Sequence, residues 1–292
     1  MSKGEDFETA FLWEGQSRLL GGSSSAVQTK YNAIATQDVK NAAADAYSFI
    51  VNQLGITTPA QQQTLGATFI KVGNITPSWG GRKIPPKTDI KFSYNSVDYK
   101  CSLKWGPPYL LSSAKLSTQQ EVFAAVIRNI FLYGQDLNEE RGAVDLLEIL
   151  LALDDMGIAD RMSMTVSENQ LGIIRGSGGL QSKLQEIVGS TTNPDVSPIY
   201  RVIKEKLVWE SLTGELQFGG GEGTANYILI GNGGRFVQFS PINTAYLRTL
   251  LPHTSARISA KGGRKPTQAQ IAEGEDPRAS YREIGIRVEV PS

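Results

Sequence analysis

The sequence predicts an α/β (α+β) fold, and three observations carry this prediction. Residues 88–104 alternate apolar and polar side chains on both sides of a short turn, as the two strands of a β-hairpin do. Short apolar runs at 227–230 and 236–239 flank a turn rich in glycine, which indicates a second hairpin. Apolar residues with helical periodicity over 37–54 add helices to these strands.

The remaining elements follow from the same periodicities and from helix signals. Pro59 stands at the first helical position after Thr58, where proline is favoured, and a Ser or Thr N-cap opens the helix that begins at residue 117. Helices are predicted over residues 5–20, 37–54, 59–70, 117–133, 143–153, 180–188, 199–212 and 245–251. Strands are predicted over 256–260 and 284–290, with a flexible break at 21–25, a loop at 73–87 and a mobile polar loop over about 262–279.

The composition excludes several classes of protein. The chain has 292 residues and balances 29 Lys and Arg against 29 Asp and Glu, which argues against a general nucleic-acid coat but allows a local basic groove. The sequence lacks an apolar run of the roughly 20 residues that a membrane span needs, and its polar N-terminus predicts no secretory signal. A single cysteine, Cys101, excludes an internal disulfide and a cysteine-rich zinc site, which fits a reducing cytoplasm. A single histidine, His253, argues against chemistry that needs several histidines.

The pattern in residues 88–104 also predicts the register of the hairpin. With Asn95 and Ser96 as the turn, Tyr94 pairs with Val97, and the apolar residues of both strands share one face. The polar residues share the other face. A slip by one residue would destroy this separation, so we expect the apolar face to pack on a core and the polar face to line a cleft.

Three polar side chains meet at one end of this hairpin. Asp89 lies opposite Ser102 in the predicted register, with Cβ atoms roughly 4.5–5.5 Å apart, and Lys104 points to the same face. A carboxylate can hold a hard divalent cation such as Mg²⁺, which polarises a phosphate and activates a bound water. A lysine can orient that water or stabilise charge that develops on the phosphate. The constellation therefore indicates phosphodiester chemistry, or else an ordinary amphipathic hairpin with solvated charges.

The same segment resembles the active-site hairpin of the PD-(D/E)xK nuclease superfamily. Residues 86–89 (Pro-Lys-Thr-Asp) match the first motif and residues 102–104 (Ser-Leu-Lys) the second, with twelve residues between Asp89 and Ser102. The closer similarity is to phage-encoded members of the superfamily. The resemblance implies a restriction-endonuclease-like core, with a central mixed sheet flanked by helices. It also implies a metal-dependent endonuclease that hydrolyses DNA with Mg²⁺ or Mn²⁺.

The resemblance gives each residue of the two motifs a role. Asp89 is implied to bind the metal, Lys104 to handle the attacking water or the transition-state charge, and Ser102 to help order the site. The Leu103 carbonyl is implied as a further oxygen ligand. An acid is usual in the superfamily where this chain has Ser102, so a second carboxylate must come from elsewhere.

Two glutamates are candidates for that second carboxylate. Glu8 lies in a Gly-Glu-Asp-Phe-Glu sequence that resembles the first-helix pattern of some family members, where the glutamate approaches the metal. Glu210 lies in a Trp-Glu-Ser-Leu-Thr-Gly segment that looks like one shared by the phage proteins. Both have another interpretation: Glu8 as a solvated acid at a helix start, favoured there by the helix dipole, and Glu210 as an exposed residue at a helix end.

Basic residues gather around the hairpin and near the C-terminus, as a groove that follows a phosphate backbone requires, although solvated loops have the same composition. The candidates for nucleic-acid binding are Arg82, Lys83, Lys87, Lys91, Lys100, Lys261, Arg264 and Lys265. Trp79 and Trp105 flank the predicted site, where they either stack on bases or belong to the core.

The resemblance implies a single elaborated nuclease-like domain over residues 1–292, with helical insertions at about 36–72 and 135–200. DNA is the expected partner, with a homodimer possible in this family and no membrane partner. A phage-encoded protein is expected in the host cytoplasm or the virion. Two other functions stay open: a non-catalytic nucleic-acid-binding protein on the same fold, and a phage structural or assembly protein.

Overall fold

The computed structural model describes residues 2–19, 21–115, 198–264, 268–272 and 281–290, and the helical positions 122, 125, 126, 129 and 130. The chain divides into two compact units. The first comprises Met1–Tyr109 and Trp209–Thr249, and the second Leu110–Val208 and Leu250–Pro291. The helices predicted at 143–153 and 180–188, and nearly all of the insertion predicted at 135–200, lie outside the described residues. The single nuclease-like domain stays a prediction.

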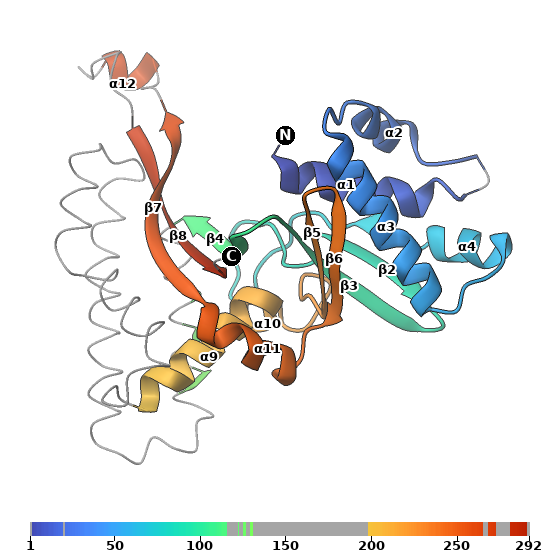
Figure 1. Ribbon diagram of the computed structural model, residues 1–292. Coiled ribbons are helices and arrows are strands. Elements are labelled where there is room, and N and C mark those ends of the chain that lie inside the picture. Colours follow the sequence, from blue (N-terminus) through green and yellow to red (C-terminus); the bar gives the residue numbers. More distant parts are fainter. Residues whose placement is uncertain are drawn as a thin grey trace. The chain divides into compact units, whose positions relative to one another are not determined.

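The described residues of the first unit form a five-stranded sheet with the strand order β1-β2-β3-β5-β6 (Figure 1). Strands β3 and β5 run parallel, and the other neighbouring pairs run antiparallel. A mixed sheet with helices packed on it confirms the predicted α+β class. The strands are β1 (Ile70–Lys71), β2 (Ile90–Tyr94), β3 (Val97–Trp105), β5 (Tyr227–Asn232) and β6 (Arg235–Pro241).

The predicted register of the first hairpin is confirmed. Tyr94 pairs with Val97, and Ile90 pairs with Cys101. The turn residues Asn95 and Ser96 have φ angles of 49° and 63°. Two successive positive φ angles are the signature of a type I′ turn, whose twist matches that of the strands it joins. The hairpin predicted at 227–239 is confirmed as well, as β5 and β6.

The apolar face of the β2–β3 hairpin packs on the core as predicted, but burial does not alternate near the end of β3, because Ser102 on the polar face is also buried. The side chains of Ile90, Phe92 and Cys101 are fully buried, and Leu103 is nearly so. Val97 belongs to the same face but is 48% exposed, because it lies at the turn, beyond the end of the core. The core on this face is therefore centred on the end of the hairpin that carries Asp89 and Lys104.

The helices of the first unit are α1 (Lys3–Gln16), α2 (Ser25–Asn32), α3 (Gln37–Gln53), α4 (Pro59–Gly66), α10 (Glu215–Phe218) and α11 (Thr244–Leu250). Helix α2 was not predicted, because it is short and its contacts with the core are limited to the partly buried Val27 and Tyr31. Helix α4 begins at Pro59 as expected, with a capping box between Thr58 and Gln61, but it ends at Gly66 and not near residue 70.

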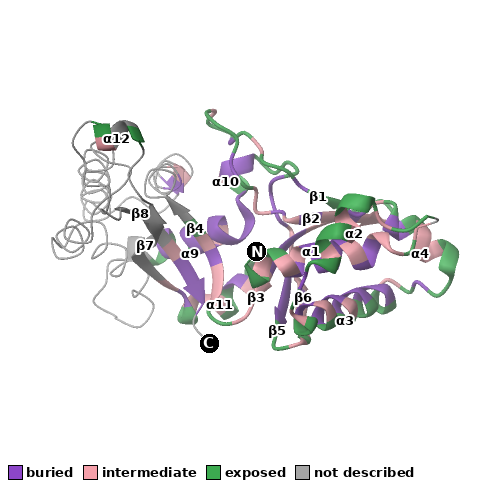
Figure 2. Cartoon of the chain, turned by 90° about the horizontal axis from the view of Figure 1, so that it is seen from above, coloured by how far each residue is buried: buried purple, intermediate pink, exposed green. Residues whose placement is uncertain are grey.

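Aromatic packing joins α1 to the sheet. On α1, the Phe7 ring lies 5.2 Å from the Trp105 ring, and the Phe11 ring lies 5.5 Å from Phe69. Phe69 in turn stacks on Phe92 of β2, with ring centroids 4.7 Å apart. Figure 2 shows the buried positions along α1 and α3. Because α3 contributes seven buried residues to this unit, it is part of the core of the unit.

The second unit contains, among its described residues, a three-stranded sheet with the order β4-β8-β7. Strand β4 (Tyr109–Lys115) was not predicted. The strands predicted at 256–260 and 284–290 are longer than expected, as β7 (Ser255–Arg264) and β8 (Tyr281–Val290). The predicted polar loop therefore begins inside a strand, and α12 (Gln268–Ala272) occupies part of it. The unit also holds most of α9 (Pro198–Thr213) and a short 3₁₀ turn, η1 (Leu251–His253).

We predict that Gly15→Ala destabilises the first unit. A Cβ at Gly15 would lie 2.2 Å from the Phe69 ring, and one at Gly66 would lie 2.6 Å from the Gly15 carbonyl oxygen. The ring belongs to the core and has little room to move, so overpacking is expected to lower the free energy of unfolding by about 1–3 kcal/mol. Urea denaturation measures the difference.

The matched control is Gly73→Ala, because a Cβ at Gly73 has nothing within 4 Å. This variant is expected to unfold at the urea concentration of the parent or slightly above it. Equal stability of the two variants would contradict the close packing of α1 on Phe69.

Candidate functional site

Asp89 is fixed against strand β3 by its main chain and its side chain. Its backbone N–H donates to the Cys101 carbonyl at 2.9 Å. Its Oδ2 accepts the backbone N–H of Leu103 at 2.7 Å. The carboxylate therefore lies beside Leu103 of β3. The ladder of paired residues ends at Ile90 and Cys101, so the predicted pairing of Asp89 with Ser102 is not part of it.

The charge of Asp89 is coupled to three other side chains of the first unit. Burial raises the pKa of Asp89 from 3.8 to about 6, and the negative charge of Glu8 acts in the same direction. The ammonium groups of Lys104 and Lys71 oppose this increase in pKa, as does the Leu103 hydrogen bond. The two lysines and the hydrogen bond therefore do not offset the cost of burying the negative charge. A bound cation would stabilise the ionised form of this carboxylate.

Glu8 comes to this site from the middle of α1. Phe7, its neighbour, anchors the helix on Trp105, so the half-buried Glu8 faces the end of the hairpin. The Glu8 carboxylate forms an ion pair with Lys71 of β1 at 2.7 Å. Of the two candidate glutamates, Glu8 is the one that influences the pKa of Asp89.

Glu210 is 1% exposed and has a different environment. Its Oε2 accepts the backbone N–H of Leu216 at 2.8 Å, and its Oε1 accepts that of Gln217 at 2.9 Å. Gly214, with a φ of 65°, makes the reversal between α9 and α10 that brings these donors back to Glu210. Burial raises the pKa of Glu210 despite both hydrogen bonds and the nearby charge of Lys87. Glu210 thus fixes the start of α10.

Lys87 is packed between these two acidic positions. A Cβ at Gly214 would lie 2.6 Å from Cγ of Lys87, so the lysine stem runs directly over that glycine. Burial lowers the pKa of Lys87 to about 8, and the charge of Lys104 acts in the same direction. Glu210 and Asp89 oppose this decrease. Lys87 therefore interacts electrostatically with Asp89 and Lys104.

Ser102 is 2% exposed and lies on the polar side of the hairpin, where it pairs with Ile228 of β5. A buried hydroxyl at this position, in place of a carboxylate, leaves Asp89 without a second acid beside it on β3, since Asp98 lies near the other end of the strand. Lys104 is half-buried two residues further along the strand and pairs with Ile230.

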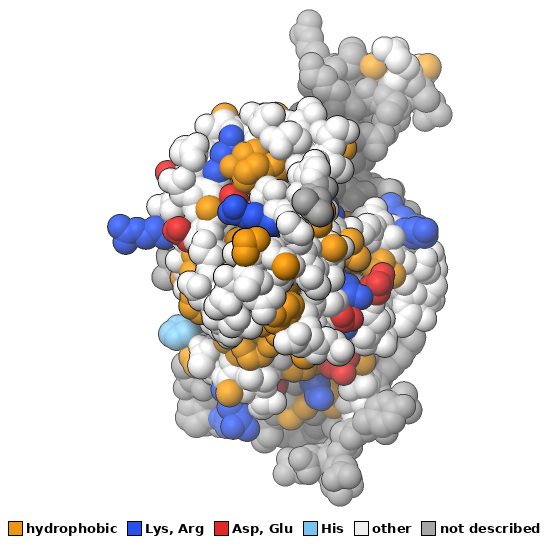
Figure 3. Space-filling view, turned by 90° about the vertical axis from the view of Figure 1, so that its right-hand side faces the viewer, with side chains coloured by type: hydrophobic (Ala, Val, Ile, Leu, Met, Phe, Trp, Pro, Cys, Tyr) orange, Lys and Arg blue, Asp and Glu red, His pale blue; other side chains and the backbone are white. Residues whose placement is uncertain are grey.

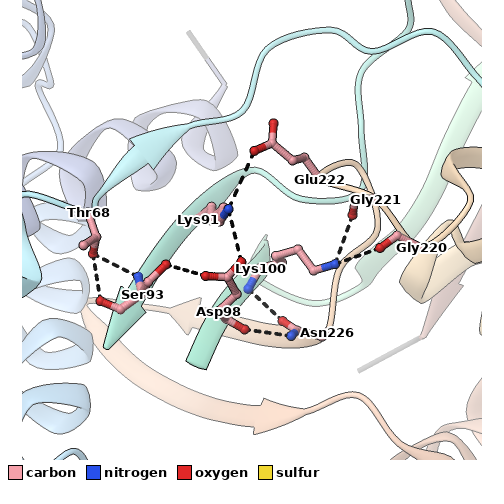
Figure 4. A network of polar contacts seen from close by, with 9 residues as sticks. All are labelled: Thr68, Lys91, Ser93, Asp98, Lys100, Gly220, Gly221, Glu222 and Asn226. Atoms are coloured by element: carbon pink, nitrogen blue, oxygen red, sulfur yellow. Dashed lines mark hydrogen bonds and ion pairs between the residues drawn. The ribbon is translucent and has the colours of Figure 1, made fainter. Parts of the chain in front are cut away.

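Lys91 contributes to a network on the polar face of the hairpin (Figure 4). Its ammonium group lies 3.2 Å from Asp98 and 3.6 Å from Glu222. The Ser93 hydroxyl also donates to Asp98, and these contacts lower the pKa of the Asp98 carboxyl. Lys91 thus links the hairpin to the glycine-rich loop at 219–223.

Lys100 binds the same loop from the neighbouring strand (Figure 4). Its Nζ donates to the carbonyl oxygens of Gly220 at 3.2 Å and Gly221 at 3.0 Å. The backbone N–H of Lys87 donates to the Gly223 carbonyl at 2.9 Å. Two of the predicted phosphate-binding lysines, Lys91 and Lys100, therefore have partners within the protein, and their role in nucleic-acid binding stays a prediction.

The other predicted nucleic-acid residues fall in two places. Arg82 and Lys83 are exposed on the loop before β2. Lys261 and Arg264 lie on β7 of the second unit, and Lys265 lies outside the described residues. Trp105 packs against Phe7 in the core, whereas Trp79 is 37% exposed.

The donors that could hold a divalent cation are Asp89, Glu8 and the Leu103 carbonyl. In a β-strand, the N–H and C=O of one residue point to the same side, so the Leu103 carbonyl faces the side on which its N–H meets Asp89. Within the described part of the chain, no three Asp, Glu, His or Cys side chains form a group that could hold a metal. A cation here would therefore depend on main-chain and water oxygens, which Mg²⁺ accepts.

Comparisons with protein-family models, curated proteins and solved structures gave no match for this chain. Among the helices that the structure describes, none combines the length and the apolar character needed to cross a bilayer.

Two features of the site were not predicted from the sequence. The helix predicted over 59–70 leaves no strand at Lys71, yet Lys71 lies on β1 and forms an ion pair with Glu8. The cap that Glu210 provides for α10 was also missed. Gly214, four residues after Glu210, indicates that the chain reverses after α9. It does not indicate that the Glu210 carboxylate accepts the N–H groups of Leu216 and Gln217.

We predict that Asp89→Asn stabilises the metal-free protein above pH 6. The folded-state pKa of about 6 exceeds the usual 3.8, so the folded protein binds this proton more tightly than the unfolded chain. Stability therefore falls as the pH rises between these two values. Asparagine keeps an oxygen for the Leu103 N–H and removes the charge, so the free energy of unfolding at pH 8 should rise by about 1–3 kcal/mol.

Urea denaturation at several pH values, in buffer with EDTA, measures this effect. The matched control is Asp98→Asn, because the pKa of Asp98 is lowered by its partners and its charge favours the folded state. A stability of Asp89→Asn at pH 8 that is no higher than that of the parent would show that the Asp89 charge is well compensated.

Proposed function

We propose that this protein is a metal-dependent endonuclease with a restriction-endonuclease-like core, which hydrolyses DNA phosphodiester bonds. One observation carries the proposal: the Asp89 carboxylate accepts a hydrogen bond from the N–H of Leu103, the residue before Lys104 on β3. The charges of Lys104 and Glu8 both act on the pKa of Asp89. An acid and a lysine at adjoining strand ends, with a second acid from a helix, can act together on one phosphate.

Asp89, Glu8 and the Leu103 carbonyl are the residues that would hold Mg²⁺ or Mn²⁺. The bound cation would supply Lewis-acid polarisation of the phosphate and a more acidic water. Asp89 orients the cation because its carboxylate is fixed on β3. Glu8 is adjustable, since its partner Lys71 is half-exposed and can release it.

Lys104 is proposed to act on the substrate directly. Its ammonium group is close enough to Asp89 to lower the pKa of that carboxyl. From this position it can orient the attacking water or stabilise negative charge on the phosphate in the transition state. Lys87, with a pKa lowered to about 8, supplies a second positive charge nearby.

Glu8 is a better candidate for the second carboxylate than Glu210. Both oxygens of Glu210 already accept N–H groups of α10, and the residue is almost fully buried. Moving it to a metal would leave two N–H groups without their acceptor, which costs about 1–3 kcal/mol for each buried group. The Glu8 carboxylate has a solvent-accessible lysine as its partner.

We predict that Asp89→Asn and Lys104→Ala lower the rate of plasmid nicking in Mg²⁺ by a factor of about 100 or more. Glu8→Gln should lower it by a factor of about 10 or more, because one metal ligand is lost. Nicking of supercoiled plasmid in Mg²⁺, Mn²⁺ and EDTA measures the rates, and circular dichroism checks that each variant is folded.

Asp6→Asn is the matched control for Glu8→Gln, since it removes an acid from the same helix. It should nick plasmid at the rate of the parent. If folded Asp89→Asn and Lys104→Ala proteins nick DNA as fast as the parent, the proposed chemistry is wrong.

A second candidate is a non-catalytic nucleic-acid-binding protein on the same fold. The buried Ser102 at the position of the usual acid favours it, since β3 then carries no carboxylate next to Asp89. DNA binding that is the same in EDTA and in Mg²⁺, with no cleavage in any metal, would support this function. The phage origin, the cytoplasmic or virion location, the homodimer and the structural or assembly role stay predictions.

A further inference from the structure

The loop before β2 presents an aromatic and two basic side chains to solvent. Trp79 is 37% exposed, and Arg82 and Lys83 are exposed. Gly80 and Gly81 between them have φ angles of 87° and 92°, which turn the chain sharply at the tip. We call residues 75–84 the Trp79 loop. An exposed indole next to two cations has the chemistry to bind a nucleic acid, through base stacking and phosphate contacts.

Backbone hydrogen bonds close the Trp79 loop at its base. Ile75 and Ile84 exchange both backbone hydrogen bonds, each at 2.9 Å, and Ile84 is buried. Gly80 N–H donates to the Pro77 carbonyl at 2.9 Å, which forms a turn next to Trp79. A loop held in this way loses little conformational entropy when it binds a partner.

The Trp79 loop is also tied to α10. Ser78 N–H donates to the Gln217 carbonyl at 2.7 Å, and the Ser78 hydroxyl donates to the Leu216 carbonyl. The N–H groups of the same two residues are the ones that Glu210 accepts. The position of Trp79 is therefore set, through α10, by the buried carboxylate of Glu210. The charges of Glu210 and Asp89 both raise the pKa of Lys87, which links this carboxylate to the surroundings of Asp89.

We propose that the Trp79 loop binds an unpaired stretch of DNA, with one base stacked on Trp79 and the adjoining phosphates on Arg82 and Lys83. This inference rests on the proposed function for its choice of DNA as the ligand. Bases in an intact duplex are stacked on each other and cannot present a face to an indole, so the loop selects unpaired nucleotides. The substrate class is then DNA with a single-stranded segment beside the cleaved bond.

Other apolar side chains also reach the surface of the described chain, as one face in Figure 3 illustrates. Phe49, on α3, is 43% exposed, and its ring packs on Phe236 of β6. Phe49 lacks basic residues beside it in sequence that match Arg82 and Lys83. It is therefore a suitable control for the loss of an exposed aromatic ring.

The test is fluorescence anisotropy of the full-length protein with two labelled DNAs in EDTA, so that no cleavage occurs. One is a single-stranded oligothymidylate, and the other is a blunt duplex closed by a covalent linker. Trp79→Ala should weaken single-strand binding by about tenfold and leave duplex binding unchanged. Trp79→Phe should retain most of the affinity, and Phe49→Ala all of it.

The basic residues have a separate signature. Arg82→Ala with Lys83→Ala should weaken binding and reduce the dependence of the affinity on salt concentration, because fewer counterions are released. An unchanged single-strand affinity in Trp79→Ala would overturn the inference. So would an equal loss for both DNAs, or an absence of single-strand binding in the parent.

The two proposals fail in different ways. Single-strand binding that depends on Trp79, in a protein that cleaves no DNA in any metal, would support the loop inference and reject the nuclease. Cleavage that depends on Asp89, with single-strand binding indifferent to Trp79, would reject the loop inference and leave the nuclease.

Discussion

The hydrogen bond from the Leu103 N–H to Asp89 Oδ2 is the interaction on which the candidate site depends. Strand β2 begins at Ile90 and does not extend as far as Leu103. The Leu103 N–H therefore donates to the Asp89 side chain and not to the main chain of a neighbouring strand. Because the donor belongs to the backbone of a strand near the centre of the sheet, the carboxylate is positioned as rigidly as the sheet itself. Glu8, Lys71 and Lys104 are then arranged around a fixed charge.

The lysines around the hairpin divide into two groups with different roles. Lys91 and Lys100 bind Asp98, Glu222 and glycine carbonyls, and so hold the glycine-rich loop on the polar face. Lys87 and Lys104 lie in the surroundings of Asp89, where their charges act on each other and on the acid. A chain with no net charge can in this way keep positive charge beside Asp89, while Lys91 on the same hairpin is paired with Asp98 and Glu222.

The sequence predicts the hairpin well and its surroundings poorly, for a physical reason. Alternation and an Asn95-Ser96 turn are local, and together they determine which residues pair. The neighbours of Lys100 lie more than 100 residues away, and the cap made by Glu210 uses main-chain groups that carry no sequence signal. Helix α2 was missed because it is short and only Val27 and Tyr31 pack against the core, each partly buried. Helix α4 ends early because the chain enters β1 at Ile70, and pairing with β2 is a tertiary contact.

The peptide group between Leu216 and Gln217 is hydrogen-bonded on both sides, which has a consequence for the role of Glu210. The carbonyl of this peptide group accepts a hydrogen bond from the Ser78 hydroxyl, and its N–H donates to Glu210. On either side of it, the Leu216 N–H also donates to Glu210, and the Gln217 carbonyl accepts the Ser78 N–H. Because both hydrogen bonds polarise this one peptide group, the Glu210 carboxylate strengthens the anchor of the Trp79 loop. Under the proposed endonuclease function, a change at Glu210 should then raise KM far more than it lowers kcat, and an assay of turnover at saturating substrate would overlook the residue.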